Sequence, residues 1–388
     1  MMAPLPADSS IGVYVHVPFC SHICPYCDFN TYAGMDSLIP RYVDALCSDI
    51  PAFPQRFGRK SAETLFLGGG TPSLLSGKDV QRIVQATAAA FDLHEEAEIT
   101  LEANPNRVDE RYFGDILKAG VNRLSLGAQT FDRRGLRVLG RQHEAEDVIA
   151  AVKSAKAAGF ANISCDMIFG WPGQSHDVWR FDLERALAAD LGLAHLSLYS
   201  LIVEPGTPMA EAVARGVLVP VGDDESADLY ETACDLLADA GWIHYEIANW
   251  TRERARQSRH NVIYWRNGDY AGFGAGAHWR IGNARRMNHL LPKIYIDAVE
   301  GGNEPASNAE EITPRISMGE TMMLGLRLLE EGVTAAEFAA RHGVSLEDAF
   351  ATPLTELSGL GLLDWDGVRA RLTQRGMMLA NDVCARFL

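Results

Sequence analysis

Six short apolar stretches rich in β-branched residues alternate with amphipathic stretches over the first half of the chain. The apolar stretches are Gly12–Phe19, Glu63–Gly68, Glu98–Ala103, Arg123–Ala128, Asn162–Phe169 and His195–Leu201. The amphipathic stretches are Ile39–Ile50, Gly77–Phe91, Glu110–Ala119, Ala145–Ala158 and Asp177–Ala189. Apolar strands separated by helices indicate βαβ units, an α/β fold and a parallel sheet. Because six units are too few for a closed eight-stranded barrel, we expect a partial (β/α)6 barrel or an open doubly wound sheet.

The pattern changes after Asp223, and we divide the chain into three parts. These are a barrel over residues 1–225, an extension of it over 226–310 and a C-terminal module over 311–388. In the middle part we expect, in order, a helix at Asp223–Ala240, a strand at Trp242–Trp250, tight glycine turns at Gly272–Gly276 and a linker at Gly301–Pro314.

The C-terminal module has the outline of a small winged-helix domain. One helix begins at Arg315, a second spans Thr334–Arg341 with Glu337 at the capping-box position, and a third spans Leu346–Leu357. Asp366-Gly367 then predicts a hairpin turn. Since this module has seven Arg but ten Asp or Glu from Arg315 onward, we expect a structural or partner-docking role rather than DNA binding.

Composition limits the class of protein. The chain has 388 residues, a formal net charge of −16 and 47% hydrophobic residues, which suits a globular protein that does not bind nucleic acid. Met1–Gly12 lacks the features of a signal peptide, and no apolar run is long enough to span a bilayer. Seven cysteines, an odd number, favour a metal site over a disulfide framework. We therefore expect a cytoplasmic protein, while a transient membrane association stays open.

Three cysteines crowd into eight positions directly after the first apolar stretch. Cys20, Cys24 and Cys27 have the spacing C-x3-C-x2-C. Thiolates are soft ligands that suit zinc or iron–sulfur clusters, and a closed site of either kind uses four protein ligands. Because only three cysteines are grouped here, a cubane cluster would keep one iron open. The missing fourth cysteine therefore favours a [4Fe–4S] cluster with one exchangeable position.

Two other interpretations of these cysteines remain. Zinc could use His16 or His22 as its fourth ligand, or the cysteines could simply be buried core residues. Their density favours a metal site over simple burial. The other cysteines are scattered over predicted helices and strands, and we interpret them as core residues: Cys47, Cys165, Cys234 and Cys384.

Polar residues stand where the predicted strands end. The run Gly68-Gly69-Gly70-Thr71 follows the second strand and predicts a tight turn, since the Gly-Lys-Ser/Thr ending of a phosphate loop is absent. Glu102 and Gln129 end the third and fourth strands, and Asp166 lies in the fifth. Because the carboxyl ends of parallel strands share one face of a barrel, we expect these residues to converge beside the cysteines. Alternatively, the carboxylates only pair with nearby arginines.

The cysteine spacing after a first strand, with Tyr26 before the third cysteine, resembles the radical S-adenosylmethionine (SAM) superfamily. The flanking Tyr14-x-His16-x-Pro18-Phe19 is similar to a narrower group, the oxygen-independent coproporphyrinogen III oxidases and the HemW haem chaperones. The resemblance covers nearly the whole chain. It implies a radical SAM partial barrel in which the cysteines hold a [4Fe–4S] cluster and SAM chelates the open iron.

The resemblance also implies the residues that meet SAM. Positions that match SAM contacts are Tyr14, Tyr26, Gly69, Gly70 and Thr71, and the place of Glu102 at a strand end makes it a candidate acceptor for ribose hydroxyls. Positions that in the oxidases contact a second SAM molecule are Gln129, Arg141 and Asp166. Whether this chain binds one SAM or two stays open.

Two features separate the two kinds of relative. The oxidases carry a further cysteine two residues after the third one, where this chain has Phe29. In addition, His260-Asn261-Val-Ile-Tyr264-Trp265 resembles the H-N-x-x-Y-W motif of the HemW branch. Neutral imidazole is a common axial ligand of haem iron, and flat aromatic rings suit a macrocycle. The resemblance thus implies that His260, Asn261, Tyr264 and Trp265 bind haem.

These features favour a haem chaperone that passes haem to acceptor haemoproteins such as respiratory cytochromes, with the cluster and SAM supporting transfer or assembly. Whether such a protein is also an enzyme stays open. The alternative is a coproporphyrinogen III oxidase, in which SAM cleavage yields a radical that abstracts hydrogen from the propionate chains. A closed iron–sulfur electron carrier is a third alternative, which the three-cysteine arrangement disfavours.

Overall fold

The structure, a computed structural model, describes residues 10–388. The interpretation that Met1–Gly12 is no signal peptide therefore falls almost entirely outside the described residues. Within residues 10–388, no helix combines the length and the apolar character that a bilayer crossing requires.

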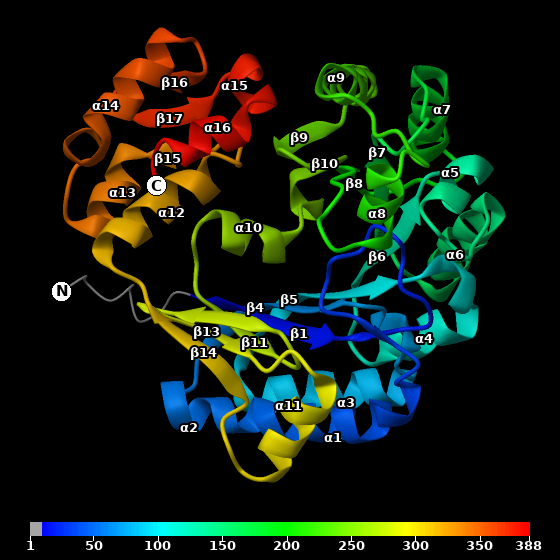
Figure 1. The fold of residues 1–388 in the computed structure, drawn as a ribbon. Coiled ribbons are helices and arrows are strands. Elements are labelled where there is room, and N and C mark those ends of the chain that lie inside the picture. The colour runs from blue at the N-terminus through cyan, green and yellow to red at the C-terminus, as the bar shows by residue number, and fades with distance from the viewer. Residues whose placement is uncertain (1–9) are drawn as a thin grey trace.

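A twelve-stranded sheet forms the centre of the molecule (Figure 1). Its six middle strands are parallel neighbours: β1 (Ile11–Val17), β4 (Ser61–Gly69), β5 (Asp92–Ala103), β6 (Arg123–Gln129), β7 (Asn162–Phe169) and β8 (His195–Ser200). The helices between them are α1 (Ile39–Asp49), α2 (Phe53–Phe57), α3 (Gly77–Ala90), α4 (Glu110–Lys118), α5 (Arg133–Val138), α6 (Ala145–Ala158) and α7 (His176–Leu187). Because the outermost strands of the sheet do not pair with each other, the barrel is open. The predicted partial (β/α)6 barrel is confirmed.

The two faces of each strand differ in character. On β1, Val13, Val15 and Val17 have no exposed surface and belong to the main hydrophobic core, which also includes residues of α1, α3, α4, α6 and α7. The alternate residues Tyr14 and His16 belong to the interior of the barrel, where they hydrogen-bond to each other. This period of two explains why polar residues occur inside apolar strands.

Both edges of the parallel sheet are extended by antiparallel strands. One edge carries β9 (Ile243–Glu246) and β10 (Asn249–Thr251), which follow the long helix α9 (Asp223–Asp239). The prediction of a single strand at Trp242–Trp250 is therefore wrong. The chain reverses because the buried Glu246 carboxylate accepts bonds from the Ala248 N–H and from the Asn249 amide, which stabilises a turn between the two short strands.

The other edge carries β11 (Tyr270–Phe273) parallel to β1, followed by β12 (His278–Ile281), β13 (Ala284–Asn288) and β14 (Ala306–Glu311). The linker predicted at Gly301–Pro314 is wrong, because β14 occupies its centre. This strand pairs on one side only and exposes most of its side chains, so its sequence is polar. The division placed at residue 310 consequently cuts through a strand of the central sheet.

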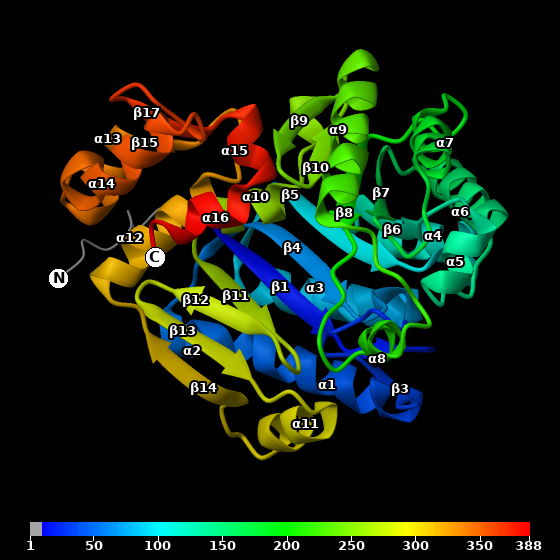
Figure 2. The same ribbon diagram turned by 45° about the horizontal axis from the view of Figure 1, so that its top comes forward.

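The C-terminal module lies apart from the barrel helices, at the upper left of Figure 1, and Figure 2 shows it at one end of β1. Its elements are α12 (Pro314–Gly325), β15 (Val333–Thr334), α13 (Ala335–His342), α14 (Leu346–Gly359), β16 (Leu363–Trp365), β17 (Arg369–Leu372), α15 (Gln374–Met378) and α16 (Ala380–Ala385). The three helices and the hairpin were predicted, whereas β15, α15 and α16 were not. Thr334 caps α13 as expected, but the Glu337 carboxylate accepts its bond from the Thr334 hydroxyl.

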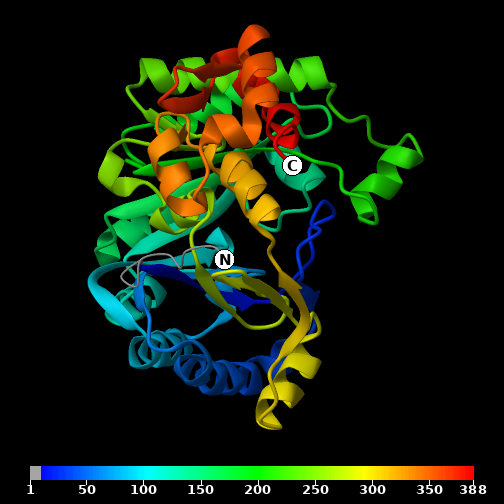
Figure 3. The same ribbon diagram turned by 90° about the vertical axis from the view of Figure 1, so that its left-hand side faces the viewer.

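Five short elements complete the chain around the site. They are β2 (Phe19–Cys20), β3 (Tyr32–Ala33), α8 (Pro208–Ala214), α10 (Arg259–Trp265) and α11 (Pro292–Glu300). The segment between β8 and α9, which carries α8, projects from the rest of the molecule at the right of Figure 3. The backbone of this segment contacts the cysteine loop, because the Met209 N–H donates a hydrogen bond of 2.9 Å to the Pro25 carbonyl.

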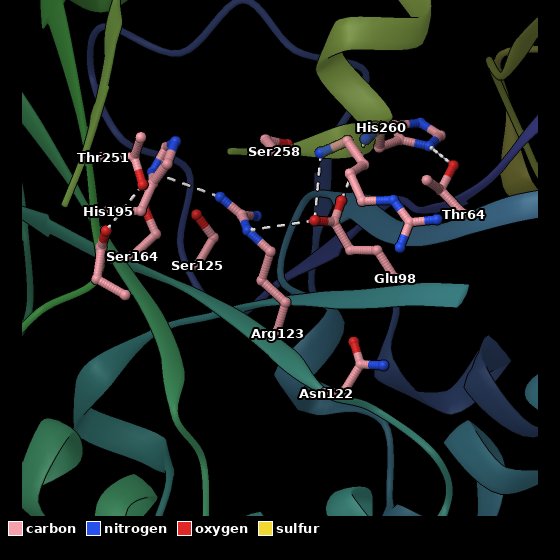
Figure 4. A network of polar contacts seen from close by, with 12 residues as sticks. Thr64, Glu98, Asn122, Arg123, Ser125, Ser164, His195, Thr251, Ser258 and His260 are labelled. Atoms are coloured by element: carbon pink, nitrogen blue, oxygen red, sulfur yellow. Dashed lines mark hydrogen bonds and ion pairs between the residues drawn. The ribbon is translucent and has the colours of Figure 1, made fainter. Parts of the chain in front are cut away.

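A buried polar network closes the amino-terminal end of the barrel (Figure 4). The Glu98 carboxylate on β5 accepts bonds from the first backbone N–H groups of α10, those of Arg259 (3.2 Å) and His260 (3.1 Å). It also lies 4.0 Å from the Arg123 guanidinium, which is 2% exposed and donates in turn to the His195 ring. Glu98 thus holds the short helix α10 in place and balances the buried charge of Arg123.

Removal of the Glu98 carboxylate should therefore destabilise the folded protein. In Glu98→Ala, Arg123 would keep its charge in a buried site without a carboxylate, and we expect a loss of about 3–5 kcal/mol in the free energy of unfolding. Urea unfolding followed by circular dichroism measures this loss. Asp190→Ala, which removes the exposed partner of Arg185, is the matched control and should change stability little. Equal effects of the two substitutions would contradict the role given to Glu98.

Candidate functional site

The three clustered cysteines line one open cleft of about 500 Å³ at the carboxyl ends of the parallel strands. Cys20 ends β2, and Cys24 and Cys27 follow in the loop, all partly buried and free of disulfides. The Thr71 hydroxyl donates to Cys20 Sγ (3.4 Å), and the Arg141 guanidinium donates to Cys24 Sγ (3.4 Å). Burial raises the pKa of the Cys20 thiol, and the bond from Thr71 acts in the opposite direction.

The geometry argues against a single zinc ion. Among residues 10–388, no three His, Cys, Asp or Glu side chains are gathered closely enough to bind one metal ion. His16 is already engaged on both ring nitrogens, by the Tyr14 hydroxyl (2.9 Å) and the Asn30 carbonyl (2.9 Å). Three thiols spread around one cleft suit a larger inorganic cluster, with one position left open.

The end of the cysteine loop is held by residues far away in the chain. The Asn30 side-chain amide donates hydrogen bonds of 3.0 Å to the carbonyls of Ala275 and Leu290. The Tyr32 hydroxyl in turn donates to Asn30 Oδ1 (2.9 Å). Gly276 makes this approach possible, because a Cβ there would lie 2.3 Å from the Asn30 amide nitrogen. The Gly272–Gly276 segment, for which tight turns were predicted, therefore also permits a close approach that clamps the cysteine loop.

The glycine run after β4 lies against the same loop. The N–H groups of Gly70 and Thr71 donate to the carbonyls of Val17 (2.9 Å) and Phe19 (2.8 Å). A Cβ on Gly70 would come within 2.7 Å of the Phe19 carbonyl oxygen and 3.1 Å of Cys20 Sγ. Only glycine therefore fits between the cysteine loop and β4, and Gly69, Gly70 and Thr71 line the cleft beside the thiols.

Glu102 and Asp166 come together in this cleft, as their positions at strand ends predicted. Glu102 accepts a bond from the Gly69 N–H (3.0 Å), and both oxygens of Asp166 accept from the Ser125 hydroxyl (2.9 Å). Within the described chain neither carboxylate forms an ion pair, so the alternative of simple arginine pairing is not supported. Burial, followed by the charge of Asp166, raises the pKa of Glu102 to about 8, and burial raises the pKa of Asp166.

Gln129 and Arg141 line the same cleft together with Tyr26, and Gln129 ends β6, the strand between those of Glu102 and Asp166. Gln129 has a φ of 65°, which is uncommon for a residue with a side chain and is typical of functional sites. The following turn is held by the buried Asp182 on α7, which accepts bonds from the Thr130 hydroxyl (2.6 Å) and the Phe131 N–H (2.7 Å).

The H-N-x-x-Y-W residues do not form one surface. His260 is 1% exposed, and its ring nitrogens bond to the Thr64 hydroxyl (2.8 Å) and the Tyr264 hydroxyl (2.9 Å). Burial, followed by the charge of Arg123, lowers the pKa of His260 to about 3, so the ring is neutral. His260, Asn261 and Tyr264 line a second cavity of about 190 Å³, which shares Glu102 and Asp166 with the cleft.

Trp265, unlike His260, Asn261 and Tyr264, does not line this cavity but contacts the C-terminal module. It packs beneath the Arg327 guanidinium of the C-terminal module, 4.3 Å from the ring centroid, and belongs to a small core with Val262 and Leu328. The four residues are therefore divided between the barrel interior and the module contact. Both ring nitrogens of His260 are occupied within the barrel, and its role as a ligand of haem iron stays a prediction.

Sequence reasoning missed three residues that shape the site. Ser125 lies two residues before Gly127 and four before Gln129 on β6, so the period of two along that strand could have identified it. Asp182 is an acidic residue at a buried position of an amphipathic helix, which is also a readable signal. Asn30 carries no local signal, because its partners lie some 250 residues away.

The clamp on the cysteine loop can be tested with a pair of glycines. Gly276→Ala should displace Asn30, and we expect at least about tenfold faster loss of iron to a chelator from the reconstituted protein, as is typical when outer support of a metal site is lost. Gly282→Ala is the matched control, because Gly282 also has a positive φ but a Cβ there meets nothing within 4 Å. Asn30→Ala should reproduce the effect of Gly276→Ala. If all three variants retained iron equally well, the proposed clamp on the cysteine loop would be refuted.

The buried Glu102 makes stability depend on pH. Because its folded pKa of about 8 lies above its unfolded value, the native state holds a proton that the unfolded state releases between pH 5 and 8. The stability contributed by protonated Glu102 is thus lost as pH rises, by at most about 1.4 kcal/mol per pH unit. Denaturant unfolding of the metal-free protein should show a weaker decline in Glu102→Gln than in the parent. The exposed Glu311→Gln should keep the parental profile, and the same profile in Glu102→Gln would contradict the assignment.

Comparison with known proteins agrees with this geometry. The chain matches the radical SAM superfamily over residues 14–185 and the HemN C-terminal domain over residues 312–379. It is 36% identical over 381 residues to the heme chaperone HemW of Bacillus subtilis (strain 168), covering 97% of this chain and 99% of that protein. It is 34% identical over 382 residues to the heme chaperone HemW of Escherichia coli (strain K12), covering 97% and 98%.

The fold also matches the solved structure of coproporphyrinogen III oxidase (HemN) from Escherichia coli, a radical SAM enzyme. The TM-score is 0.84, and the match covers 98% of this chain and 91% of that one. At 22% sequence identity this likeness shows the fold alone. The family is determined by the sequence similarity to the chaperones, which extends over nearly the full length of the chain. The chain belongs to the HemW family of the radical SAM superfamily.

Proposed function

We propose that this chain is a haem chaperone that binds haem and passes it to acceptor haemoproteins such as respiratory cytochromes. The observation that carries the proposal is the similarity over nearly the whole chain to proteins named heme chaperone HemW. The coproporphyrinogen III oxidase is similar at the level of the fold only. The radical SAM family further implies a [4Fe–4S] cluster and SAM.

The residues of the cleft fit these two groups. Cys20, Cys24 and Cys27 would bind three irons of the cluster, and SAM would occupy the fourth. A reduced [4Fe–4S] cluster can supply one electron to the sulfonium of SAM. Around that position the chain offers backbone at Gly69 and Gly70, carboxylates at Glu102 and Asp166, and polar or aromatic side chains, namely Tyr14, Tyr26, Thr71, Gln129 and Arg141.

The positions of the lining residues in the cleft suggest a different role for each of them. Gly70 allows the segment that leads into Cys20 to pack against the glycine run, and Arg141 places a positive charge beside Cys24. Glu102, already fixed by the Gly69 N–H, can accept bonds from ribose hydroxyls. Gln129, Arg141 and Asp166 also line the cleft, where they would contact a second SAM molecule if one is bound.

The oxidase is the second candidate, and Phe29 bears on it. The side chain that replaces the oxidases' extra thiol is 68% exposed at the cleft. It offers a flat apolar contact in place of a titratable and oxidisable group. This difference favours binding of a macrocycle over proton or hydrogen transfer to it.

The remaining parts of the proposal concern partners and location. We propose that the C-terminal module, residues 311–388, is a docking surface for acceptor proteins, since it has its own hydrophobic core and contacts the barrel through Trp265 and Asn267. The free cysteines and the net charge of −16 support a cytoplasmic protein that does not bind nucleic acid. Any contact with a membrane would be transient and made while haem is delivered.

Three measurements on one preparation test the function. After anaerobic reconstitution we expect about four irons and four sulfides per chain, lost in Cys24→Ser and kept in Cys47→Ser, whose thiol lies outside the cleft. We expect haem to bind and to move to an apo-cytochrome, as absorption spectra of the separated proteins would show. Coproporphyrinogen III should not be converted to protoporphyrinogen IX. Turnover of that substrate, or failure to bind haem, would overturn the chaperone proposal.

A further inference from the structure

The outer edge of the cleft carries an unusual group of exposed apolar side chains. Ile23, Phe29 and Ile202 all line the cleft that contains the cysteines, and they are 40%, 68% and 64% exposed. Ile23 and Phe29 belong to the cysteine loop, whereas Ile202 belongs to the segment that follows β8. Large apolar residues clustered at a cleft typically mark a ligand or partner site. Together with His22, we call these residues the rim patch.

His22 is the polar member of the rim patch. It lies between Cys20 and Cys24, is exposed and lines the same cleft. Within residues 10–388 its ring forms no hydrogen bond. By contrast, His16, His195 and His260 bond through both ring nitrogens inside the barrel. Of the histidines at the two cavities, His22 is the one whose ring is open to a ligand from outside.

We propose that the rim patch is the haem-holding surface of this chain, with an imidazole nitrogen of His22 as axial ligand to the iron. This inference rests on the proposed haem-binding function and deepens it. An axial imidazole beside apolar side chains is the combination that binds haem in proteins. Ile23, Phe29 and Ile202 would contact the flat macrocycle, and Phe29 would offer its ring face.

The position of the rim patch suits delivery. A haem that is handed to another protein must be reached by that protein, and a haem at the mouth of the cleft is reachable. A haem on His260 would require α10 to leave Glu98, Thr64 and the barrel interior. The exposed rim therefore permits transfer without opening the fold.

The charges at the rim determine the orientation of the haem. Asp28 and Glu204 line the same cleft, so they would repel the propionate groups. The propionates would then point outward into solvent, while the vinyl edge faces the apolar residues. An acceptor with basic side chains could engage the exposed propionates before the iron changes its ligand.

The test uses the full-length protein after anaerobic cluster reconstitution, titrated with ferric haem and followed at the Soret band. Replacement of the axial ligand in His22→Gly should weaken haem binding at least about tenfold and change the spectrum. Added imidazole should restore the parental spectrum in His22→Gly, because the small ligand fills the space of the lost ring. Phe29→Ser should weaken binding without a change of axial ligation. His176→Ala, an exposed histidine at the start of α7 outside the cleft, is the matched control and should bind as the parent does.

The outcomes separate this inference from the function on which it rests. If the parent protein binds no haem, the chaperone proposal fails and this inference fails with it. If the parent binds haem and His22→Gly binds it equally well, with the same spectrum, the rim patch is refuted while the chaperone proposal stands. Loss of binding in His260→Ala with intact binding in His22→Gly would likewise overturn the assignment, in favour of a haem inside the barrel.

Discussion

The site depends on four consecutive backbone carbonyls at the end of β1. The carbonyls of residues 16 to 19 accept hydrogen bonds from the Tyr42 hydroxyl (2.8 Å), the Gly70 N–H (2.9 Å), the Tyr32 N–H (2.7 Å) and the Thr71 N–H (2.8 Å). These donors come from α1, the glycine run and the end of the cysteine loop. Polar groups of buried irregular backbone must form hydrogen bonds. Because all four carbonyls have such a partner, the backbone that leads into Cys20 has little conformational freedom.

This arrangement links the metal site to the ligand site. The glycine run that would meet SAM is bonded to the segment that leads into Cys20, so a shift of one moves the other. On the far side, Asn30 ties the end of the cysteine loop to the turn after β11 and to Leu290. The loop is thus held at both ends and open only toward the cleft. A reactive cluster requires such a rigid shell, since its ligands must keep their spacing when the metal is bound.

Inside the barrel, two polar layers have different tasks. The layer of Glu98, Arg123 and His195 closes the amino-terminal end and holds α10. The layer of Glu102 and Asp166, closer to the carboxyl ends of the strands, faces the cleft. The motif that the sequence suggested for haem touches both layers, because Glu98 binds the His260 N–H while His260, Asn261 and Tyr264 line the cavity that contains Glu102 and Asp166. Because His260 is buried, the proposed haem surface is the exposed rim patch instead.

Local patterns in the sequence determined a large part of this protein. Short apolar stretches separated by amphipathic ones predicted the six parallel strands, because a parallel sheet is covered by helices and its strands are joined through them. The spacing of Cys20, Cys24 and Cys27 predicted an open metal site, and Glu102 and Asp166 were expected to meet because parallel strands end at one face. Each of these inferences needs only the covalent geometry of a short segment and the direction of the strands.

Other features were decided only in the folded chain, where residues far apart in sequence meet. The polar stretch around β14 became a strand because β13 offered it a free edge, and Trp242–Trp250 was divided because Glu246 is buried against its turn. The resemblance to the H-N-x-x-Y-W motif implied that His260 binds iron, but in the folded chain Thr64 and Tyr264 occupy both of its ring nitrogens. Sequence specifies which groups can bind a ligand, whereas tertiary packing determines which of them remain accessible, because a buried polar atom must take its partner from whatever the fold places beside it.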